Sequence, residues 1–395
     1  MSSQLRWLKK NGALWLSCFQ IGWLLDQWGA RWLYLGGLAL CGLLSLLMPL
    51  AATQGGWRAF LALRLVQGSA MEVAWPAVFF VVPVWFPKSE TGFVSGLVLC
   101  GFQVASLASM LLSAVFCDST LTWEGMYYFV GLVSLGGSVL WFFLFEDDPR
   151  KCWFIQGPEL NHILESRELS RRPGIGNIPQ LLQSLLTCLP VIALIMCNFC
   201  SFYLFYFVGG FLPTYFKEVL NLPVINSGVY AAIPSLAQIL GQVLAGKLSD
   251  CLMLRYRTQT TLIVKLFTGV SGILPAVCII CITAVNSVPL IVLLLTLASF
   301  FNGFTIGGHM KAIYLLSPPL KGTLSGFCAT AMYLSGILCA YVTGAIIPQG
   351  TADQWSLAFY ITSSVMVLGT LIFWVFGSAK QQDSLSVYSV SSSAD

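Results

Sequence analysis

Two ionisable residues attract attention because they lie inside an apolar run of transmembrane length. The run extends from Phe60 to Glu90 and contains Arg64 and Glu72. An ionised side chain at the centre of a bilayer costs about 2.5 to 3.5 kcal/mol on insertion scales, so each residue needs a partner or a water-filled cavity. A helix that carries both is therefore expected to line a pathway. Arg64 is either a structural arginine satisfied by a neighbouring helix or a fixed positive charge that attracts an anion.

Helical geometry keeps these two side chains apart. At 100° per residue, Glu72 lies about 80° round the helix from Arg64 and about 12 Å along its axis. We therefore do not expect them to form an ion pair with each other. If Glu72 acts at all, we expect it to act in coupling rather than in holding the anion.

Further polar side chains occur on two later apolar runs. Tyr203 and Tyr206 carry hydroxyls that can hydrogen-bond an oxyanion, and His309 can titrate near neutrality. The alternative for each is packing or hydrogen bonding between helices, and Lys311 is expected to extend its ammonium group to the membrane surface. The predicted substrate-binding residues are Arg64, Tyr203, Tyr206, Asn302 and His309, with Glu72 as the coupling candidate.

Composition identifies the broad class of protein. Of 395 residues, 57 % are hydrophobic and only 9 % are charged, whereas an ordinary soluble domain is about 25 % charged. The chain is therefore predicted to be an all-α polytopic membrane protein. Its net charge of +4 is dispersed without a basic stripe, so nucleic acid is not an expected partner.

Catalytic and metal-binding motifs do not emerge from the sequence. There is no P-loop, no Gly-x-Ser-x-Gly elbow and no His-rich helix, so an enzyme is not expected. Most of the 13 cysteines lie inside apolar runs, where they are better explained as small core residues than as disulfides or metal ligands. No metal or cofactor is predicted.

Apolar windows predict ten full spans and one short one. The short segment, Gly12 to Leu25, is too short to cross a core of about 30 Å and resembles the second half of a helix. The full spans are predicted at roughly 33–52, 58–84, 93–116, 125–145, 188–215, 227–249, 261–285, 288–314, 322–347 and 356–377. Glycines in and near them are predicted close-packing positions, namely Gly36, Gly37, Gly68, Gly101, Gly241 and Gly246.

A long polar segment divides the spans into two groups. The predicted organisation is an N-terminal bundle at 1–145, a linker at 146–187, a C-terminal bundle at 188–378 and a tail at 379–395. Most Lys and Arg residues fall on the side of the linker, which makes the linker and the tail cytoplasmic. The tail is rich in Ser and poor in apolar residues, so we expect it to be disordered.

A similar element occurs once in each half of the chain. The first runs from Gly22 through Asp26 to Arg31, and the second contains Gly246 and Asp250. An acid at a helix end, followed by a base in a tight turn, can latch the cytoplasmic side of a bundle. Its recurrence indicates an internal repeat, as in transporters that rock two bundles around a midplane site. The predicted cytoplasmic gate is Asp26, Arg31, Asp250 and Arg255.

Taken together, these motifs resemble the major facilitator superfamily. Finer matches resemble its anion:cation symporter family, which includes sialin, the sodium/phosphate cotransporters and the vesicular glutamate transporters. They are Arg64-Leu-Val-Gln67-Gly68, Pro76-Ala77, Pro87-Lys-Ser-Glu90, Phe199-Cys200-Ser201, Phe205-Tyr206-Phe207, Leu212-Pro213-Thr214-Tyr215, Asn302-Gly303-Phe304, Gly350-Thr351, Trp355 and Phe359-Tyr360. The resemblance extends from Gly22 to Ser378.

The resemblance implies a fold and an activity. The fold is two six-helix bundles, and the activity is secondary active transport of small anions, either inorganic phosphate or organic carboxylates, by alternating access. It further implies symport with Na⁺ or H⁺, no cofactor, a monomer in the lipid bilayer, and a plasma membrane or a lysosomal or vesicular membrane as the location.

Several departures from the family pattern leave an alternative open. Nothing matches the family's first helix with its arginine, so the N-terminal bundle is predicted to be incomplete. The family's glutamate seven residues after the arginine is replaced by Met71, with Glu72 one position later, and a Leu-Asp-x-Ala-Pro motif reads Tyr314-Leu-Leu-Ser-Pro318. The alternative is a non-transporting degenerate paralogue or an incomplete gene product of the same family.

The charge asymmetry makes a prediction about topology. Single cysteines placed at Ser170 and Ser392, in a background without reactive cysteines, should resist impermeant thiol reagents added to intact cells, because both positions are predicted to be cytoplasmic. Both should react once the cells are permeabilised. Ready labelling of either position in intact cells would contradict the predicted orientation.

Overall fold

The computed structural model describes residues 21–87, 89–120, 122–153, 155, 157–166, 184–185, 187–220, 224–285 and 287–381. Most of the predicted short first segment, about half of the linker and the tail after 381 lie outside these ranges, as do Ser170 and Ser392. Every regular element within the described residues is a helix.

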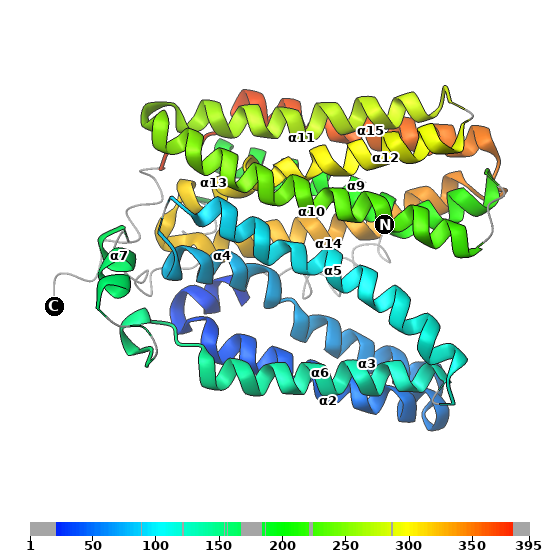
Figure 1. Ribbon diagram of the computed structural model, residues 1–395, viewed down its shortest axis with the longest axis horizontal. Coiled ribbons are helices and arrows are strands. Elements are labelled where there is room, and N and C mark those ends of the chain that lie inside the picture. Colours follow the sequence, from blue (N-terminus) through cyan, green and yellow to red (C-terminus); the bar gives the residue numbers. More distant parts are fainter. Residues whose placement is uncertain are drawn as a thin grey trace, which may run out of the picture. The chain divides into compact units, whose positions relative to one another are not determined.

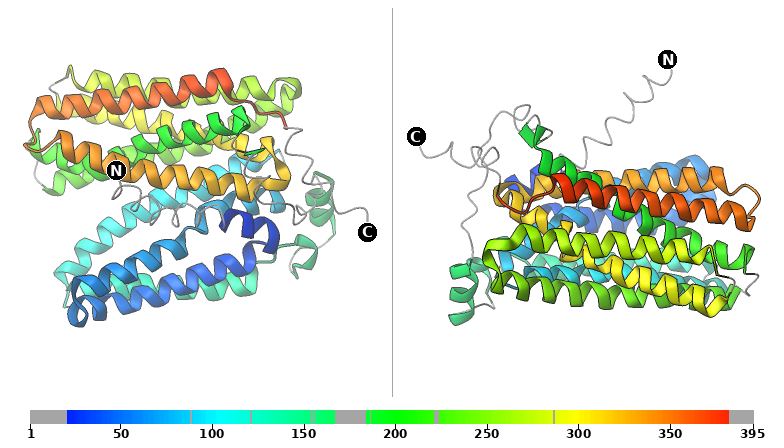
Figure 2. Two further views of the ribbon diagram at one scale, coloured as in Figure 1. Left: turned by 180° about the vertical axis from the view of Figure 1, so that it is seen from behind. Right: turned by 90° about the horizontal axis from the view of Figure 1, so that it is seen from above.

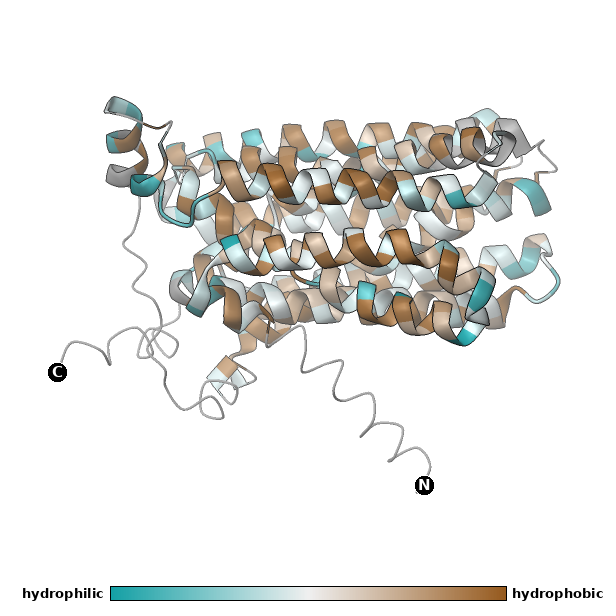
Figure 3. Cartoon of the chain, turned by 90° about the horizontal axis from the view of Figure 1, so that it is seen from below, coloured by the Kyte–Doolittle hydropathy of each residue, from teal (hydrophilic) through white to brown (hydrophobic). Residues whose placement is uncertain are grey.

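Each predicted span coincides with a helix or with a pair of helices in line, and residues 21–28 are also helical. Nine spans among the described residues are long and apolar enough to cross a membrane, and Figure 3 shows hydrophobic residues along their length. The helices are α2 (Ala30–Gln54), α3 (Gly56–Met71), α4 (Ala74–Trp85), α5 (Thr91–Asp118), α6 (Thr122–Leu144), α7 (Pro158–Ser166), α9 (Leu189–Glu218), α10 (Val224–Arg255), α11 (Thr260–Ile282), α12 (Val288–Asn302), α13 (His309–Leu316), α14 (Lys321–Ile346) and α15 (Ala352–Phe376). The four short 3₁₀ turns are η1 (Pro149–Lys151), η2 (Arg257–Gln259), η3 (Gly303–Ile306) and η4 (Pro318–Leu320).

Contacts between residues divide the chain into two compact units. Unit 1 consists of residues 1–87, 104–172 and 320–329, and unit 2 consists of residues 88–103, 173–319 and 330–395. The helices α5 and α14 are therefore each divided between the units. The bundle boundaries at 145 and 188 stay a prediction.

In unit 1, α2 and α6 run side by side (Figure 1). A Cβ atom added to Gly42 on α2 would lie 3.0 Å from the carbonyl oxygen of Gly131 on α6. The two glycines thus allow the backbones to approach closely, as is usual between membrane helices. The buried residues assigned to α6 are only Gly125, Gly131 and Ser138, so most of its apolar side chains lie on the surface of unit 1.

In unit 2, α15 packs against both α9 and α11 (Figure 2). A Cβ atom on Gly369 of α15 would lie 2.4 Å from the Cβ of Cys200 on α9. Toward the other end of α15, Trp355 and Phe359 pack against Phe207 and Tyr215 of α9. The core of unit 2 therefore centres on aromatic rings between these two helices.

Two spans are interrupted near their middle. The first breaks at Glu72 and Val73, between α3 and α4, and the second at η3, between α12 and α13. Both interrupted spans are the second helical span after the repeated aspartate, at Asp26 and Asp250 respectively. The break thus recurs with the repeat, and breaks of this kind commonly mark functional positions in membrane helices.

The predicted close-packing glycines divide into two groups. A Cβ atom would lie 2.6 Å from the carbonyl oxygen of Ala70 at Gly37, 2.1 Å from that of Phe300 at Gly241 and 2.3 Å from that of Gly92 at Gly246. The prediction is confirmed for these three. It is wrong for Gly36, Gly68 and Gly101, where, apart from chain neighbours and the backbone of the same helix turn, no described atom would lie within 4 Å of the added Cβ atom.

Gly241 provides a test of helix packing. Replacing it with Ala should force α10 away from Phe300 on α12, and overpacking of this kind costs typically about 1–3 kcal/mol. We expect a lower midpoint of thermal unfolding for the protein purified in detergent.

The matched control is Gly210→Ala on α9, where nothing described lies within 4 Å of the new Cβ atom. There we expect no loss or a small gain, because Ala favours helix over Gly by roughly 1 kcal/mol. Equal effects of the two substitutions would contradict the close approach of α10 and α12.

Candidate functional site

Arg64 lies exposed on α3 of unit 1, where its guanidinium contacts neutral and aromatic groups. Its Nη2 donates to the hydroxyl of Tyr127 at 2.6 Å, and its Nη1 donates to Oε1 of Gln67 at 3.2 Å. Its Cζ lies 5.3 Å from the ring centre of Phe60 and 5.1 Å from that of Tyr127. Both ring contacts are within the range of cation–π attraction.

A second hydrogen bond fixes the orientation of Gln67. Its Nε2 donates to Oγ of Ser45, on α2, at 2.7 Å. The amide oxygen of Gln67 therefore faces Arg64, since its nitrogen is used on the other side. The resulting chain, Ser45–Gln67–Arg64–Tyr127, connects α2, α3 and α6 and contains a single charge.

Glu72 caps the C-terminal end of α3 at the break in the span, and it is 9 % exposed. It is not among the partners of Arg64, which are Gln67, Tyr127 and the Phe60 ring. The expectation from helical geometry that the two residues do not pair is thus confirmed. Glu72 instead lies at the interruption between α3 and α4.

The two predicted tyrosines lie on α9 of unit 2. Tyr203 is 2 % exposed and belongs to the aromatic core of that unit. Tyr206 is half-buried, and a Cβ atom on Gly336 of α14 would lie 2.9 Å from its ring. Packing against neighbouring residues thus accounts for the positions of both rings.

Asn302 and His309 lie at the two ends of the η3 break in unit 2. Oδ1 of Asn302 accepts from Nε2 of Gln238 at 3.2 Å, and the His309 ring faces Phe373 at 6.3 Å between ring centres. Nδ2 of Asn302 and both ring nitrogens of His309 are buried without a hydrogen-bond partner among the described residues. Because buried polar atoms are normally hydrogen-bonded, these two side chains can still bind a polar group.

Asp26 caps a helix instead of pairing with Arg31. Its carboxylate accepts from the backbone N–H groups of Gly322 and Thr323, at 2.9 Å and 2.7 Å, and from the Thr323 hydroxyl at 2.7 Å. These donors lie at the N-terminus of α14, where the helix dipole favours a negative charge. Burial raises the pKa of Asp26 to about 6, although these donors and Lys321 act in the opposite direction.

Arg31 has a different acidic partner. It forms an ion pair with Glu146, just after α6, and its Nη2 donates to the carbonyl oxygen of Phe142 at 3.2 Å. Asp147 accepts from the backbone N–H groups of Ala30 and Arg31, at 2.7 Å and 3.0 Å, and so caps α2. The base of the first repeated element therefore connects α2 to the end of α6.

Asp250 repeats the capping role in unit 2. Its carboxylate accepts from the backbone N–H groups of Gly92 and Phe93, at 3.1 Å and 2.8 Å, at the N-terminus of α5. It also forms a buried ion pair with Lys311 of α13, whose ammonium group donates to Oγ of Ser249 at 2.8 Å.

The expected behaviour of Lys311 is wrong, because its side chain is 3 % exposed and does not reach the surface. Arg255, the predicted partner in the gate, is exposed and lies 5.8 Å from the ring centre of Tyr256. The base that neutralises Asp250 therefore comes from a helix distant in sequence, and no local spacing pointed to it.

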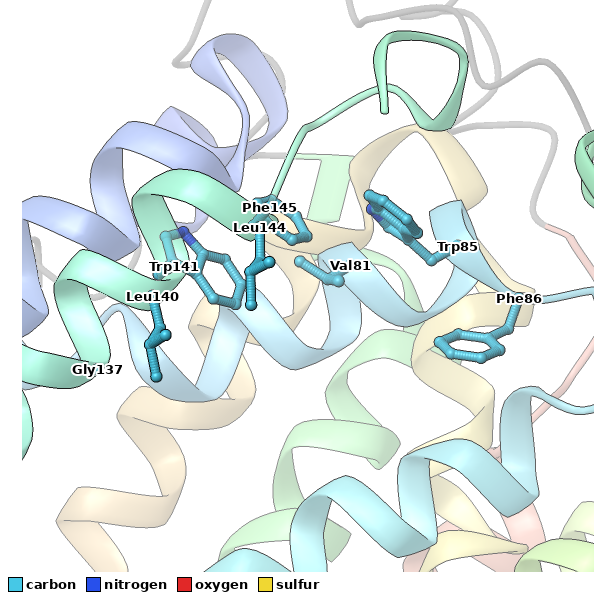
Figure 4. A pocket seen from close by; sticks show the side chains of 8 residues that line it. All are labelled: Val81, Trp85, Phe86, Gly137, Leu140, Trp141, Leu144 and Phe145. Carbon is cyan, nitrogen blue, oxygen red and sulfur yellow. The ribbon is translucent and has the colours of Figure 1, made fainter. Parts of the chain in front are cut away.

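A groove in unit 1 lies between the C-terminal ends of α4 and α6 (Figure 4). Its volume is about 440 Å³, and it is lined by Val81, Trp85, Phe86, Gly137, Leu140, Trp141, Leu144 and Phe145. None of these side chains is charged. The groove is therefore unsuited to a small anion, and we separate it from the candidate site around Arg64.

Within the residues that the structure describes, no group of three or more His, Cys, Asp or Glu side chains is arranged to hold a metal ion.

Comparison with known proteins establishes the family. The sequence profile of the Major Facilitator Superfamily matches residues 13–277, about two thirds of the chain. The chain belongs to this superfamily. Together with the apolar spans, this makes it a multi-pass integral membrane protein.

Individual relatives confirm the finer resemblance. A human protein described as a probable small intestine urate exporter is 27 % identical over 364 residues, covering 92 % of this chain and 72 % of that protein. Sheep sialin is 27 % identical over 365 residues, with the same coverage of 92 % and 72 %. The mouse sodium-dependent phosphate transport protein 3 is 28 % identical over 373 residues, covering 93 % and 76 %.

Solved structures agree with this fold. The proton:xylose symporter XylE superposes with a TM-score of 0.69 at 13 % identity, covering 95 % of this chain and 87 % of that one. The human organic anion transporter TETRAN superposes with a TM-score of 0.66 at 19 % identity, covering 91 % and 80 %. These likenesses confirm the major facilitator fold for the helices described above.

Lys311 provides a test of the buried ion pair. Replacing it with Met should leave the Asp250 charge buried without its counter-charge, which typically costs about 3–5 kcal/mol. We expect a markedly lower midpoint of thermal unfolding in detergent, and partial recovery when Asp250→Asn is added to Lys311→Met.

The matched control is Lys247→Met, because Lys247 is exposed on the same helix as Asp250. Surface substitutions of this kind usually change stability by less than about 0.5 kcal/mol. The ion pair would be unimportant if Lys311→Met and Lys247→Met gave the same midpoint.

Proposed function

We propose that this protein is a secondary active transporter of small anions that works by alternating access, with Arg64 as the main anion-binding residue. The expected substrates are inorganic phosphate or organic carboxylates. Uptake is expected to be coupled to Na⁺ or H⁺.

One observation carries this proposal. Arg64 lies on a membrane-spanning helix, yet its partners among the described residues, Tyr127, Gln67 and Phe60, are all neutral. A charge within a membrane span is normally paired or lines a pathway. An anionic substrate would supply the missing counter-charge during transport.

The guanidinium of Arg64 keeps enough donors for this role. It carries five N–H donors, of which Tyr127 and Gln67 use two. The remaining donors can form paired hydrogen bonds with a carboxylate or a phosphate, which Arg binds in a planar, two-pronged geometry.

The relatives support the same class of substrate. Their descriptions name urate and phosphate, and sialin belongs to the same group. The phosphate transporters are described as sodium-dependent, which supports coupling to a cation. In this chain Glu72 is the coupling candidate, because it is a buried acid at the break in the span that carries Arg64.

The two capping aspartates suit a gate. Asp26 and Asp250 hold the N-termini of α14 and α5 through backbone N–H groups, and such contacts can be broken and formed again without covalent change. We infer that both caps are released when the cytoplasmic side opens during alternating access. Arg31 then has a supporting role through its ion pair with Glu146. Arg255 has one at the exposed surface.

The experiment that tests this function is uptake into proteoliposomes. The purified chain is reconstituted and offered labelled phosphate, sialate, glutamate or urate, with and without sodium and pH gradients. Gradient-dependent uptake of at least one anion is expected. No uptake of any of them would favour the alternative, a non-transporting member of the superfamily.

Arg64 provides the sharpest prediction for this function. Loss of one charge-assisted hydrogen bond typically costs about 1.5 to 3 kcal/mol, or roughly ten- to a hundredfold in affinity. Arg64→Lys should therefore bind the anion poorly, and Arg64→Gln should bind it worse, since Lys lacks the two-pronged geometry and Gln also lacks the charge. Apparent affinity is measured by competition of uptake, normalised to protein in the membrane.

Two further variants serve as comparisons. Arg58 lies on the same helix, is exposed, and contacts the ring of Trp57. Arg58→Gln should leave the affinity for the anion unchanged. Glu72→Gln should change the dependence on the cation gradient more than the affinity for the anion. Unchanged affinity in an Arg64→Gln protein that reaches the membrane would remove Arg64 from the site.

A further inference from the structure

We propose that Tyr127 is a second anion-binding residue: its hydroxyl oxygen accepts a hydrogen bond from Arg64 while its O–H group donates to the same oxyanion. This inference rests on the proposed function, because it assigns a further ligand to the same site. It concerns α6, a helix that carried none of the predicted site residues.

Hydrogen-bond chemistry fixes the direction of the contact between Arg64 and Tyr127. A guanidinium can only donate, so the Tyr127 oxygen must be the acceptor over the 2.6 Å that separates it from Nη2. The phenolic proton of Tyr127 is then available for donation to another group. No described residue accepts it, since the contacts of Tyr127 besides Arg64 are ring contacts with Phe60 and Trp123.

The same contact makes Tyr127 a better donor. A hydroxyl that accepts from a cation is polarised, and its own O–H bond then donates more strongly. An oxyanion beside Arg64 would therefore find the guanidinium donors and a strengthened hydroxyl donor together. Tyr127 and Arg64 would act as one unit, and neither alone would provide the full set.

Neighbouring rings hold Tyr127 in this position. Trp123, one turn earlier on α6, meets its ring edge-on at 5.8 Å between centres, and Phe60 of α3 does so at 6.4 Å. Gln67 and Ser45 hold Arg64 from the opposite side. Because both partners are already oriented, little conformational entropy is lost on binding.

This set of donors defines the class of ligand. The guanidinium can donate two parallel hydrogen bonds to two oxygens of one carboxylate or phosphate, and Tyr127 can donate a third. A monatomic anion has no separate oxygens to match the two parallel guanidinium donors, so we expect it to bind more weakly. The ligand class is thus an oxyanion with at least two oxygens on one centre, and carboxylates and phosphate are separate arms of the test.

The test is a comparison of Tyr127→Phe with Tyr128→Phe. Tyr127→Phe removes the hydroxyl and keeps the ring over Arg64, whereas Tyr128 is the adjacent tyrosine, 41 % exposed, and outside the site. Binding is measured on the purified full chain as the anion-dependent rise in the thermal unfolding midpoint, titrated separately with phosphate, glutamate, sialate, urate and chloride. We expect Tyr127→Phe to weaken oxyanion binding about ten- to a hundredfold, and Tyr128→Phe to leave it unchanged.

A double substitution tests whether the two residues act together. If they do, Arg64→Lys combined with Tyr127→Phe should bind little worse than the weaker single variant, because each alone already breaks the unit. If Tyr127 had only a structural role, Tyr127→Phe would lower the thermal unfolding midpoint without anion and leave the binding constants unchanged. That result would overturn the inference. It would also be overturned if the unmodified protein bound none of the oxyanions, or bound chloride equally well.

Failure of the proposed function gives a different result. Oxyanion binding that depends on Tyr127, together with no uptake in proteoliposomes, would refute transport and keep Tyr127 as an anion-binding residue. Uptake with unchanged affinity in Tyr127→Phe would support transport and remove Tyr127 from the anion-binding site.

Discussion

The cost of leaving charge unpaired in a bilayer explains how this protein treats its few ionisable residues. Asp250 pairs with Lys311 and caps the N-terminus of α5, and Asp26 accepts from three donors at the start of α14, where Lys321 is a nearby cation. Arg64 departs from this pattern, because its partners among the described residues are all neutral and include no acid. A residue that breaks the general rule of charge pairing in membranes is a strong candidate for function. The proposal of anion transport depends on this contrast.

The two halves of the chain share a plan but differ in its chemistry. Both place an aspartate before a pair of spans, and in both the second of these spans is broken, at Glu72–Val73 and at η3. The aspartates also cap helices in the same way. Their side-chain partners differ, however. Asp26 accepts a hydrogen bond from the Thr323 hydroxyl, whereas Asp250 forms an ion pair with the Lys311 ammonium group. The two caps should therefore differ in how firmly they hold.

Two features determine how the helices pack. One is the close approach of backbones at small residues, and the other is the broad apolar surface of some helices. At Gly241 the neighbouring backbone of α12 leaves no room for a methyl group, and at Gly246 that of α5 leaves none. By contrast, α6 presents most of its apolar side chains on the surface of unit 1. Without a hydrophobic driving force in lipid, close van der Waals contact is a main source of helix association. The glycine contacts are thus the positions where single methyl groups should matter most.

The sequence by itself determined the membrane class, the spans and the family, because apolar length and recurring motifs are local properties that survive without knowledge of contacts. It also predicted correctly that Arg64 and Glu72 do not pair, since both lie on one helix whose period is known. Tertiary structure alone decided the partners: Tyr127 and Lys311 lie 63 and 61 residues from the groups they contact. It also decided that Gly37 and not Gly36 meets a neighbouring helix, because adjacent residues face directions about 100° apart and only packing selects one of them. Spacing along a chain specifies a helix face, but only the arrangement of helices specifies what that face meets.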